Sequence, residues 1–236
     1  SERKWIQIGT VNIASEKELE KEREKIVRTT FKLENSELFN FYIFKFSNGK
    51  GAFMLNIHHL ISDAWTLALI CNEIIKTYSA LKQNKEIETK AIYSYMDYIK
   101  SEKEYQKSEK FNKDKEYWER RFEKIPEVAT IPGSVKENID TLNPRAKRKQ
   151  YELNETEVKR IKQYCKDNKI SLYNFFMAIY SIYIGEISNL DEFVIGTPIL
   201  NRTNFKEKSA AGMFINMAPL KIKLNENINF KEFAKE

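Results

Sequence analysis

Two apolar runs separated by a short polar segment constrain the fold of this chain more than any other feature. The runs are FNFYIFKF at 39–46 and AFMLNIHHL at 52–60, and SNGKG lies between them. An Asn-Gly pair between two such runs favours a β-hairpin. Apolar residues then recur at helical spacing from Trp65 to about Leu81, which predicts an amphipathic helix after the hairpin.

The same kinds of pattern predict further elements. Ser15 with Glu18 is typical of a capping box that opens a charged helix to about Val27. The other expected elements are strands at 5–13, 149–153, 192–200 and 217–224, and helices at about 92–105, at 109–124, after Asn154 with Glu157 behind it, and at 171–187. The last helix, SLYNFFMAIYSIYIGEI, is apolar on nearly every side, so we expect it to be buried.

Residues 125–148 separate two expected lobes. This segment has three prolines, one glycine and little periodicity, which favours an extended crossover linker. We therefore expect an N-terminal lobe at 1–124 and a C-terminal lobe at 149–236, in an α/β fold. With 236 residues, 42% of them hydrophobic, the chain can bury a sizeable core.

The formal net charge of +6 does not indicate a nucleic-acid partner. Lysine and glutamate are interleaved in segments such as EKELEKEREK, a pattern typical of solvated helix faces. No segment is apolar over the length of a bilayer, and SERKWIQIG lacks the apolar core of a signal peptide, so we expect a cytoplasmic protein without a membrane partner. Cys71 and Cys165 lack CxxC spacing and are expected to be reduced.

The only two histidines, His58 and His59, lie at the end of the second run, just before Asp63. Side chains alternate along a strand, so the two imidazoles are expected to point apart and not to bind one metal ion. An acid between a strand and a helix is a good N-cap, although Ser62 competes for that position. His59 could be a hydrogen-bonded core residue or, at the mouth of a crevice, could accept or hold a proton.

Motifs of several large enzyme classes are absent. The chain has no GxSxG elbow, no Walker A loop and no dinucleotide-binding glycine fingerprint. The sequence therefore contains none of the common motifs that would indicate a hydrolase, a kinase or a dehydrogenase. The histidine pair remains the main candidate for chemistry.

Several segments together resemble one family. HHLISDAWT at 58–66 resembles the HHxxxDG motif of nonribosomal peptide synthetase condensation domains, relatives of chloramphenicol acetyltransferase. TTFKLENSELFNFYIF resembles the family's segment before that motif, and YSYMDYIKSEKEY with KDKEYW resembles the segment after it. EFVIGTPILNRTN and GMFINMAPLKI resemble core motifs of the second lobe, in the family's order. The resemblance covers nearly the whole chain.

The resemblance implies particular roles for the motif residues. His59 would be the active-site residue, whereas His58 and Asp63 would be structural supports. Arg202 of LNRT would reach from the second lobe and pair with Asp63. This pairing is physically reasonable because a buried carboxylate needs a partner, and arginine supplies a forked one.

Ala64 stands where the motif has glycine. A positive φ at this position would penalise alanine by roughly 1 kcal/mol or more, whereas the first turn of a helix suits it, and we expect the helix. The other expected site residues are Trp65 as structural support, and Ser62, Thr66 and Asn216 as candidates to line a channel or orient an intermediate. Helix capping explains Ser62 and Thr66 at least as well, and a turn explains Asn216 equally well.

The resemblance also implies an architecture and a reaction. The fold would consist of two chloramphenicol-acetyltransferase-like lobes in a V-shaped arrangement, incomplete here at both ends because family members extend further. The reaction would join a carrier-tethered acyl or peptidyl thioester to a carrier-tethered aminoacyl group through an amide bond. No cofactor or metal would bind directly, since 4′-phosphopantetheine arms deliver the substrates. Carrier domains and adjacent adenylation domains would be the partners.

Three alternatives stay open on these grounds. An epimerization domain would share the histidine motif and invert a stereocentre. A stand-alone acyltransferase would use CoA or a soluble amine. A non-catalytic docking or interaction domain would keep the fold without turnover, and Ala64 is the only hint of it.

Overall fold

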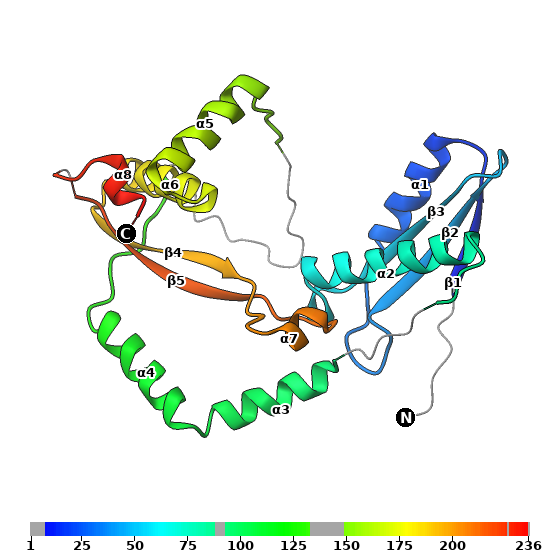
Figure 1. The fold of residues 1–236 in the computed structure, drawn as a ribbon, viewed down its shortest axis with the longest axis horizontal. Helices are drawn as coiled ribbons and strands as arrows, with labels where there is room; N and C mark the ends of the chain where they lie inside the picture. The colour runs from blue at the N-terminus through cyan, green and yellow to red at the C-terminus, as the bar shows by residue number, and fades with distance from the viewer. Residues whose placement is uncertain (1–7, 88–92, 133–148, 226, 236) are drawn as a thin grey trace. The chain divides into compact units, whose positions relative to one another are not determined.

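The structure is a computed structural model that describes residues 8–87, 93–132, 149–225 and 227–235 (Figure 1). Contacts within the chain define unit 1, Ser1–Ser108 with Leu200–Asn216, and unit 2, Glu109–Ile199 with Met217–Glu236. The boundaries of the expected lobes, 1–124 and 149–236, differ from the boundaries of these two units. The division into lobes therefore stays a prediction. Of the expected linker, 125–132 has no helix or strand, and 133–148 lies outside the described residues.

The predicted hairpin forms the centre of unit 1. β2 (Phe39–Phe46) pairs antiparallel with β3 (Gly51–Ile57), and β1 (Ile8–Ile13) pairs parallel with β2, giving the order β1-β2-β3. Gly49 lies in the turn with a φ of 79°, a conformation that glycine adopts without steric cost. The first predicted strand is confirmed from residue 8 onward, because 5–7 lie outside the described residues.

α1 (Glu16–Val27) packs against this sheet (Figure 1). Ile26 of α1 forms a buried cluster with Ile13 and Phe44 of the strands. The side chain of Ser15 caps the helix by accepting a hydrogen bond from the amide of Glu18. The Glu18 carboxylate accepts from the amide of Ala14 and not of Ser15, so only the first half of the predicted capping box forms as expected.

The remaining helices of the first half also follow the predicted pattern. The chain leaves β3 through one turn of 3-10 helix, η1 (His59–Ile61), and then forms α2 (Ala64–Lys82). The two mixed-charge helices are α3 (Tyr95–Tyr105) and α4 (Glu109–Arg121). The expected start of the first one, at 92, lies outside the described residues. A short helix, α7 (Phe205–Ser209), belongs to unit 1.

Unit 2 combines a two-stranded sheet with helices. β4 (Glu192–Ile199) pairs with β5 (Asn216–Lys223), and the helices α5 (Glu155–Asn168), α6 (Leu172–Ser188) and α8 (Phe230–Phe233) complete the described elements besides α4. Asn154 and Glu157 form the predicted capping box at the start of α5. Phe193 of β4 is fully buried against Ile184 of α6 and Ile222 of β5.

Two predictions for this half of the chain are wrong. Residues 149–153 form no strand, because no described strand pairs with them, and Tyr151 is 87% exposed. α6 is a helix as predicted but is buried on one face only. Ala178, Ser181 and Gly185 lie on the buried face, whereas large apolar side chains on the opposite face are exposed.

Within the described residues, no single helix has the length and apolar character of a membrane span. α5 and α6 satisfy the same criteria only when taken together, as a pair bent by 101°.

Candidate functional site

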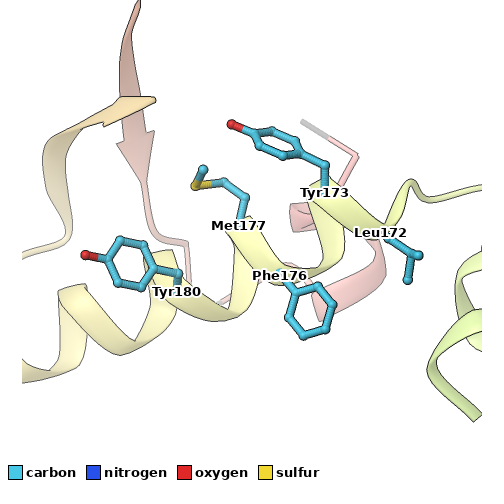
Figure 2. Close-up of a pocket in the computed structure, with 5 residues that line it drawn as sticks. All are labelled: Leu172, Tyr173, Phe176, Met177 and Tyr180. Atoms are coloured by element: carbon cyan, nitrogen blue, oxygen red, sulfur yellow. The ribbon is translucent and has the colours of Figure 1, made fainter. Parts of the chain in front are cut away.

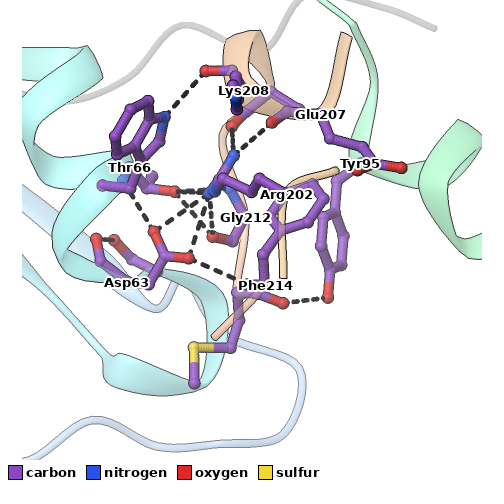
Figure 3. Close-up of polar contacts among 12 residues, drawn as sticks. Asp63, Thr66, Tyr95, Arg202, Glu207, Lys208, Gly212 and Phe214 are labelled. Carbon is purple, nitrogen blue, oxygen red and sulfur yellow. Dashed lines mark hydrogen bonds and ion pairs between the residues drawn. The ribbon is translucent and has the colours of Figure 1, made fainter. Parts of the chain in front are cut away.

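A buried ion pair between Asp63 and Arg202 forms the centre of the candidate site (Figure 3). Nη2 of Arg202 lies 3.1 Å from Oδ1 and 3.2 Å from Oδ2 of Asp63, and both side chains are fully buried. The pairing that the family resemblance implies is therefore present, and both residues belong to unit 1. Because an unpaired buried carboxylate costs several kcal/mol, the guanidinium makes the burial of Asp63 tolerable.

Asp63 is also the N-cap of α2. Its Oδ1 accepts a hydrogen bond from the amide of Thr66 at 2.8 Å, and its Oδ2 accepts from the amide of Phe214 at 3.1 Å. Burial alone would raise the pKa of the Asp63 carboxyl, but hydrogen bonds from Thr66, Phe214 and Arg202 hold that pKa below its ordinary value. The carboxylate is therefore ionised at neutral pH. Ser62, the competing cap candidate, is buried beside it and donates to the carbonyl of Asp63.

Arg202 connects this carboxylate to α7 and to the loop that follows α7. Its Nη1 donates to the carbonyls of Glu207 at 2.5 Å and Ala210 at 2.6 Å, and its Nη2 lies 3.3 Å from the carbonyl of Gly212. The guanidinium carbon lies 3.8 Å from the centroid of the Phe214 ring, a cation-π contact. Nε is buried and has no hydrogen-bond partner among the described residues. The forked shape of arginine is needed here, because one ammonium could not reach all these acceptors.

The first turn of α2 binds the same loop through its side chains. The hydroxyl of Thr66 donates to the carbonyl of Gly212 at 2.7 Å and accepts from the amide of Gly212 and from Nη2 of Arg202. The indole of Trp65 donates to the carbonyl of Lys208 at 2.9 Å. Three hydrogen bonds occupy the buried hydroxyl of Thr66, all to Gly212 and Arg202, so the geometry favours binding of this loop over channel lining for Thr66. The cap of α2 is supplied by Asp63 and not by Thr66.

Two tyrosines of α3 enclose the ring of Phe214. The ring centroids of Tyr95 and Tyr98 lie 5.2 Å and 4.4 Å from that of Phe214. The hydroxyl of Tyr95 donates to the carbonyl of Met213 at 2.7 Å, and the hydroxyl of Tyr98 accepts from the side-chain amide of Asn201 at 3.1 Å. Burial raises the pKa of both phenols, which therefore stay neutral. The loop is thus held from α2 and from α3.

His58 and His59 do not share the strand as predicted. β3 ends at Ile57, and Nδ1 of His58 accepts a hydrogen bond from the amide of Leu60 at 3.0 Å, which starts the 3-10 turn. The alternation along the strand therefore does not extend to His59. The ring of His58 packs edge-on against Phe31 at 5.8 Å. The side chain of His59 is exposed, and no described residue is hydrogen-bonded to its ring.

The remaining expected site residues lie at the margins of this network. Ala64 is the first residue of α2 and is not among the described residues with positive φ, as expected. Trp65 is partly exposed, and Asn216 is exposed at the start of β5. Among the described residues no group of three or more His, Cys, Asp or Glu could hold a metal ion.

Gly212 and Phe214 were not singled out from the sequence. They contribute mainly through backbone atoms, since the amide of Phe214 binds Asp63 and both polar backbone atoms of Gly212 bind Thr66. Every residue type except proline carries both of these groups, so composition and spacing do not reveal them. The only available signal is their place in the segment GMFI, whose glycine lies 10 positions after Arg202.

Comparison with known proteins identifies the family. The sequence model of one protein family, described as Condensation domain, matches residues 1–236 of this chain. Surfactin synthase subunit 1 of Bacillus subtilis (strain 168) is 32% identical over 206 residues, which are 86% of this chain and 6% of that protein. Bacitracin synthase 2 of Bacillus licheniformis is 24% identical over 219 residues, which are 90% of this chain and 8% of that protein.

Solved structures share the fold. The starter condensation domain of rhizomide synthetase, in complex with C8-CoA, matches 99% of this chain and 54% of its own with a TM-score of 0.81 at 18% identity. The first condensation domain of the CDA synthetase matches 97% of this chain and 51% of its own with a TM-score of 0.78 at 17% identity. These matches confirm the predicted α/β class, and this chain spans about half the length of those structures. Because the family model covers residues 1–236, the chain belongs to the condensation domain family.

Proposed function

We propose that this chain supplies the histidine site of a condensation domain that forms amide bonds in nonribosomal peptide synthesis. The donor is an acyl or peptidyl thioester on one carrier domain, and the acceptor is the α-amine of an aminoacyl thioester on another. The observation that carries the proposal is the exposed imidazole of His59, four residues before the buried Asp63–Arg202 pair, in a chain of this family.

The proposed reaction is aminolysis of a thioester. The amine nitrogen attacks the thioester carbonyl carbon, a C–N bond forms, and the C–S bond of the tetrahedral intermediate breaks. His59 holds the attacking amine and accepts the proton that nitrogen loses, and the leaving thiolate takes up a proton. Since a free α-amine has a pKa of about 7.7–8.0, little deprotonation is needed at neutral pH. Orientation of the two tethered substrates therefore contributes much of the rate.

Asp63 acts in this proposal as a structural support. Both of its carboxylate oxygens accept hydrogen bonds, from Arg202 and from two backbone amides, and the side chain is fully buried. A carboxylate engaged in this way has no free lone pair directed at solvent for a substrate proton. Its role is to fix the start of α2, and with it the turn that carries His59.

The partners and the location are part of the same proposal. The curated relatives are long synthases of which this chain matches 6% and 8%, a proportion that leaves room for carrier and adenylation domains in such a polypeptide. The substrates would arrive on 4′-phosphopantetheine arms, so the condensation site itself would bind no cofactor of its own. We infer a cytoplasmic location from the same relationship.

The proposal is tested by dipeptide formation. A condensation domain that carries this chain is supplied with a donor and an acceptor carrier loaded with amino acids, and the product is measured by mass spectrometry. His59→Ala should lower the rate by about 10²–10⁴-fold, the range of general acid–base catalysis and positioning. Leu60→Ala is the matched control, because Leu60 is a neighbouring exposed residue whose side chain lies outside the hydrogen-bond network. An equal product yield from the His59→Ala and unmodified proteins would remove His59 from the mechanism.

A further inference from the structure

The loop between α1 and β2, residues 28–38, carries one aromatic ring, that of Phe31. Phe31 is half-buried, whereas residues 28–30 and 32–37 are all exposed. Its ring lies against the imidazole of His58, with the ring centroids 5.8 Å apart and the ring planes at 88°. In this arrangement the positive edge of one ring faces the negative face of the other, which stabilises the pair beyond the area that it buries.

The loop has contacts of its own on both sides of this ring. Before it, the hydroxyl of Thr29 donates to the carbonyl of Lys25 at 3.1 Å, which holds the start of the loop to α1. After it, residues 34–36 form a bend in which Asn35 has a φ of 55°, a conformation that asparagine tolerates better than most residues. The hydroxyl of Ser36 donates to the carbonyl of Lys32 and closes the bend. The loop is therefore folded, although most of its side chains are exposed.

Two hydrogen bonds hold the same segment to the end of β3. The side-chain amide of Asn56 donates to the carbonyl of Ile26 in α1 at 3.3 Å. The backbone amide of His58 donates to the carbonyl of Leu38 at 2.8 Å. Phe31 lies between Ile26 and Leu38 in the sequence, so both arms of the loop are fixed beside the residue that its ring contacts.

The imidazole of His58 determines the geometry of the turn that carries His59. Nδ1 of His58 accepts a hydrogen bond from the amide of Leu60 at 3.0 Å and so caps η1, which begins at His59. An accepting ring nitrogen carries no proton, so the proton of the uncharged imidazole lies on Nε2. A half-turn of the ring would replace Nδ1 by a carbon and remove the acceptor. The cap therefore requires one orientation and one tautomer of His58.

Phe31 differs from the aromatic residues that lie on the surface of this chain. Phe176 and Tyr180 project from α6, as Figure 2 shows, and are 47% and 49% exposed. The ring of Phe31 is half-buried instead, and its partner is the imidazole that caps η1. Contact with Phe31 therefore limits the rotation of a ring whose orientation matters for the site.

We propose that Phe31 is a positioning residue of the candidate site. Its ring holds the imidazole of His58 in the orientation and tautomer that cap η1, and the capped turn fixes the direction of the His59 side chain. The catalytic part of this inference rests on the proposed function, in which His59 holds the attacking amine. Because orientation contributes much of the rate of such a reaction, a small displacement of His59 lowers the rate.

Nitrogen NMR of the imidazole rings tests the orientation directly in this chain, prepared without a histidine tag. The chain contains only two histidines, so a His59→Gln variant assigns the signals of His58. In the unmodified chain at neutral pH, we expect Nδ1 of His58 to show the chemical shift of an unprotonated nitrogen and Nε2 that of a protonated one. Phe31→Leu keeps an apolar side chain without the ring, and the two shifts should move toward each other as the tautomers mix. Phe31→Tyr restores the ring and should restore the separate shifts.

Leu33→Ala is the matched control, because Leu33 lies in the same loop and is 56% exposed. It should leave both nitrogen shifts of His58 unchanged, and circular dichroism checks that each variant is folded. Phe31→Met, which also lacks a ring, replaces Phe31→Leu if the leucine variant does not fold. A protonated Nδ1 of His58 in the unmodified chain would overturn the proposal without any variant. Separate shifts that persist after loss of the Phe31 ring would overturn it as well.

The catalytic consequence is measured by dipeptide formation in a condensation domain that carries this chain. Phe31→Leu should lower kcat about tenfold and leave KM nearly unchanged, because the substrates still bind while His59 is displaced. Phe31→Tyr should recover most of the rate, and Leu33→Ala should keep all of it. An unchanged kcat in Phe31→Leu, in a domain that His59→Ala inactivates, would overturn the positioning role.

The two measurements separate this inference from the proposed function. The nitrogen shifts need no turnover, so they decide whether Phe31 orients the His58 ring whatever the activity of the domain. Full activity of His59→Ala would refute the proposed function and the catalytic role of Phe31 with it. Loss of activity in His59→Ala, together with unchanged nitrogen shifts in Phe31→Leu, would refute the role of Phe31 alone.

Discussion

Arg202 lies within 3.1 Å of Asp63, although 139 positions separate the two residues in the sequence. The pair connects the N-cap of α2 to the loop between α7 and β5, and neither side chain is exposed to solvent. Because each charge depends on the other for its burial, the pair requires the loop and the helix to stay together. Loss of the pair should therefore lower the free energy of unfolding of the chain.

Asp63→Ala should destabilise the chain by about 3–5 kcal/mol, because it leaves the Arg202 guanidinium buried without its counter-charge. Urea unfolding followed by circular dichroism measures this change. Glu155→Ala is the control, since the Glu155–Lys159 pair is exposed and its loss should leave the free energy of unfolding nearly unchanged. An unchanged unfolding curve together with lost activity would contradict the structural role of Asp63.

Thr66→Val should destabilise the chain by about 1–3 kcal/mol, because it removes the hydroxyl that binds both backbone polar atoms of Gly212. The amide of Gly212 then loses its partner in a buried site, and the carbonyl of Gly212 keeps only its longer contact with Nη2 of Arg202. Thr66→Ser keeps the hydroxyl and should recover most of that loss. The free energies of unfolding of the two variants, compared in one urea series, test this account. Equal losses in both variants would assign the effect to packing of the methyl group instead.

Gly212→Ala should destabilise the chain by about 1–3 kcal/mol through overpacking. A Cβ atom at this position would collide with the ring of Tyr95, which its hydrogen bond to Met213 and its contact with Phe214 hold in place. Gly51→Ala is the matched control, because the nearest atom to a Cβ there lies at an ordinary 3.6 Å. Thermal unfolding of both variants measures the difference, and a stable Gly212→Ala variant would show that the Tyr95 ring moves freely.

Local features of the fold could be predicted from the sequence because local interactions determine them. The hairpin follows from alternation and the Asn-Gly turn, and the start of α5 follows from Asn154 and Glu157, which bind each other across three residues. The sequence offers two candidates for the N-cap of α2, Asp63 and Ser62. The structure identifies Asp63 as the cap, because its carboxylate accepts a hydrogen bond from the amide of Thr66.

Features that depend on distant partners could not be predicted in the same way. The Asp63–Arg202 pair was expected only through the family resemblance, since nothing local links positions so far apart. The strand expected at 149–153 and the full burial expected for α6 failed for a related reason. A segment's own pattern predicts that it needs a partner, but it does not say whether the described chain supplies one. His59 lies outside β3 because the imidazole of His58 accepts a hydrogen bond from the amide of Leu60 and so caps η1, the 3-10 turn that begins at His59.

Ala64→Gly should destabilise the chain modestly, by up to about 1 kcal/mol, although the related motif has glycine at this position. Ala64 begins α2 and is not among the described residues with positive φ, so glycine would add flexibility without relieving strain. Urea unfolding and the dipeptide assay are run on the same preparation. A gain of stability, or a large gain of activity, would contradict the view that alanine fits the first turn of this helix.

The stability of the chain should fall in acid, and Asp63 should account for part of that fall. Hydrogen bonds hold the pKa of the Asp63 carboxyl in the folded state below its ordinary value despite burial, whereas the unfolded chain restores a pKa near 3.9. The unfolded state therefore binds a proton first as the pH decreases. The stabilisation from Asp63 is fully present above that value and is lost as the pH falls toward the folded-state pKa.

Urea midpoints measured between about pH 2.5 and pH 7 for the unmodified chain and for Asp63→Asn test this dependence, since asparagine cannot titrate. The Asn variant should be less stable at neutral pH, because Arg202 loses its counter-charge. The difference between the two curves should begin to shrink below about pH 4 and should keep shrinking as the pH falls toward the folded-state pKa of Asp63. The difference between the curves isolates Asp63 from other carboxylates such as Glu207, which titrate in both proteins. Parallel curves over the whole range would mean that Asp63 has the same proton affinity in the folded and unfolded states, and the hydrogen bonds around it would then contribute nothing to its ionisation.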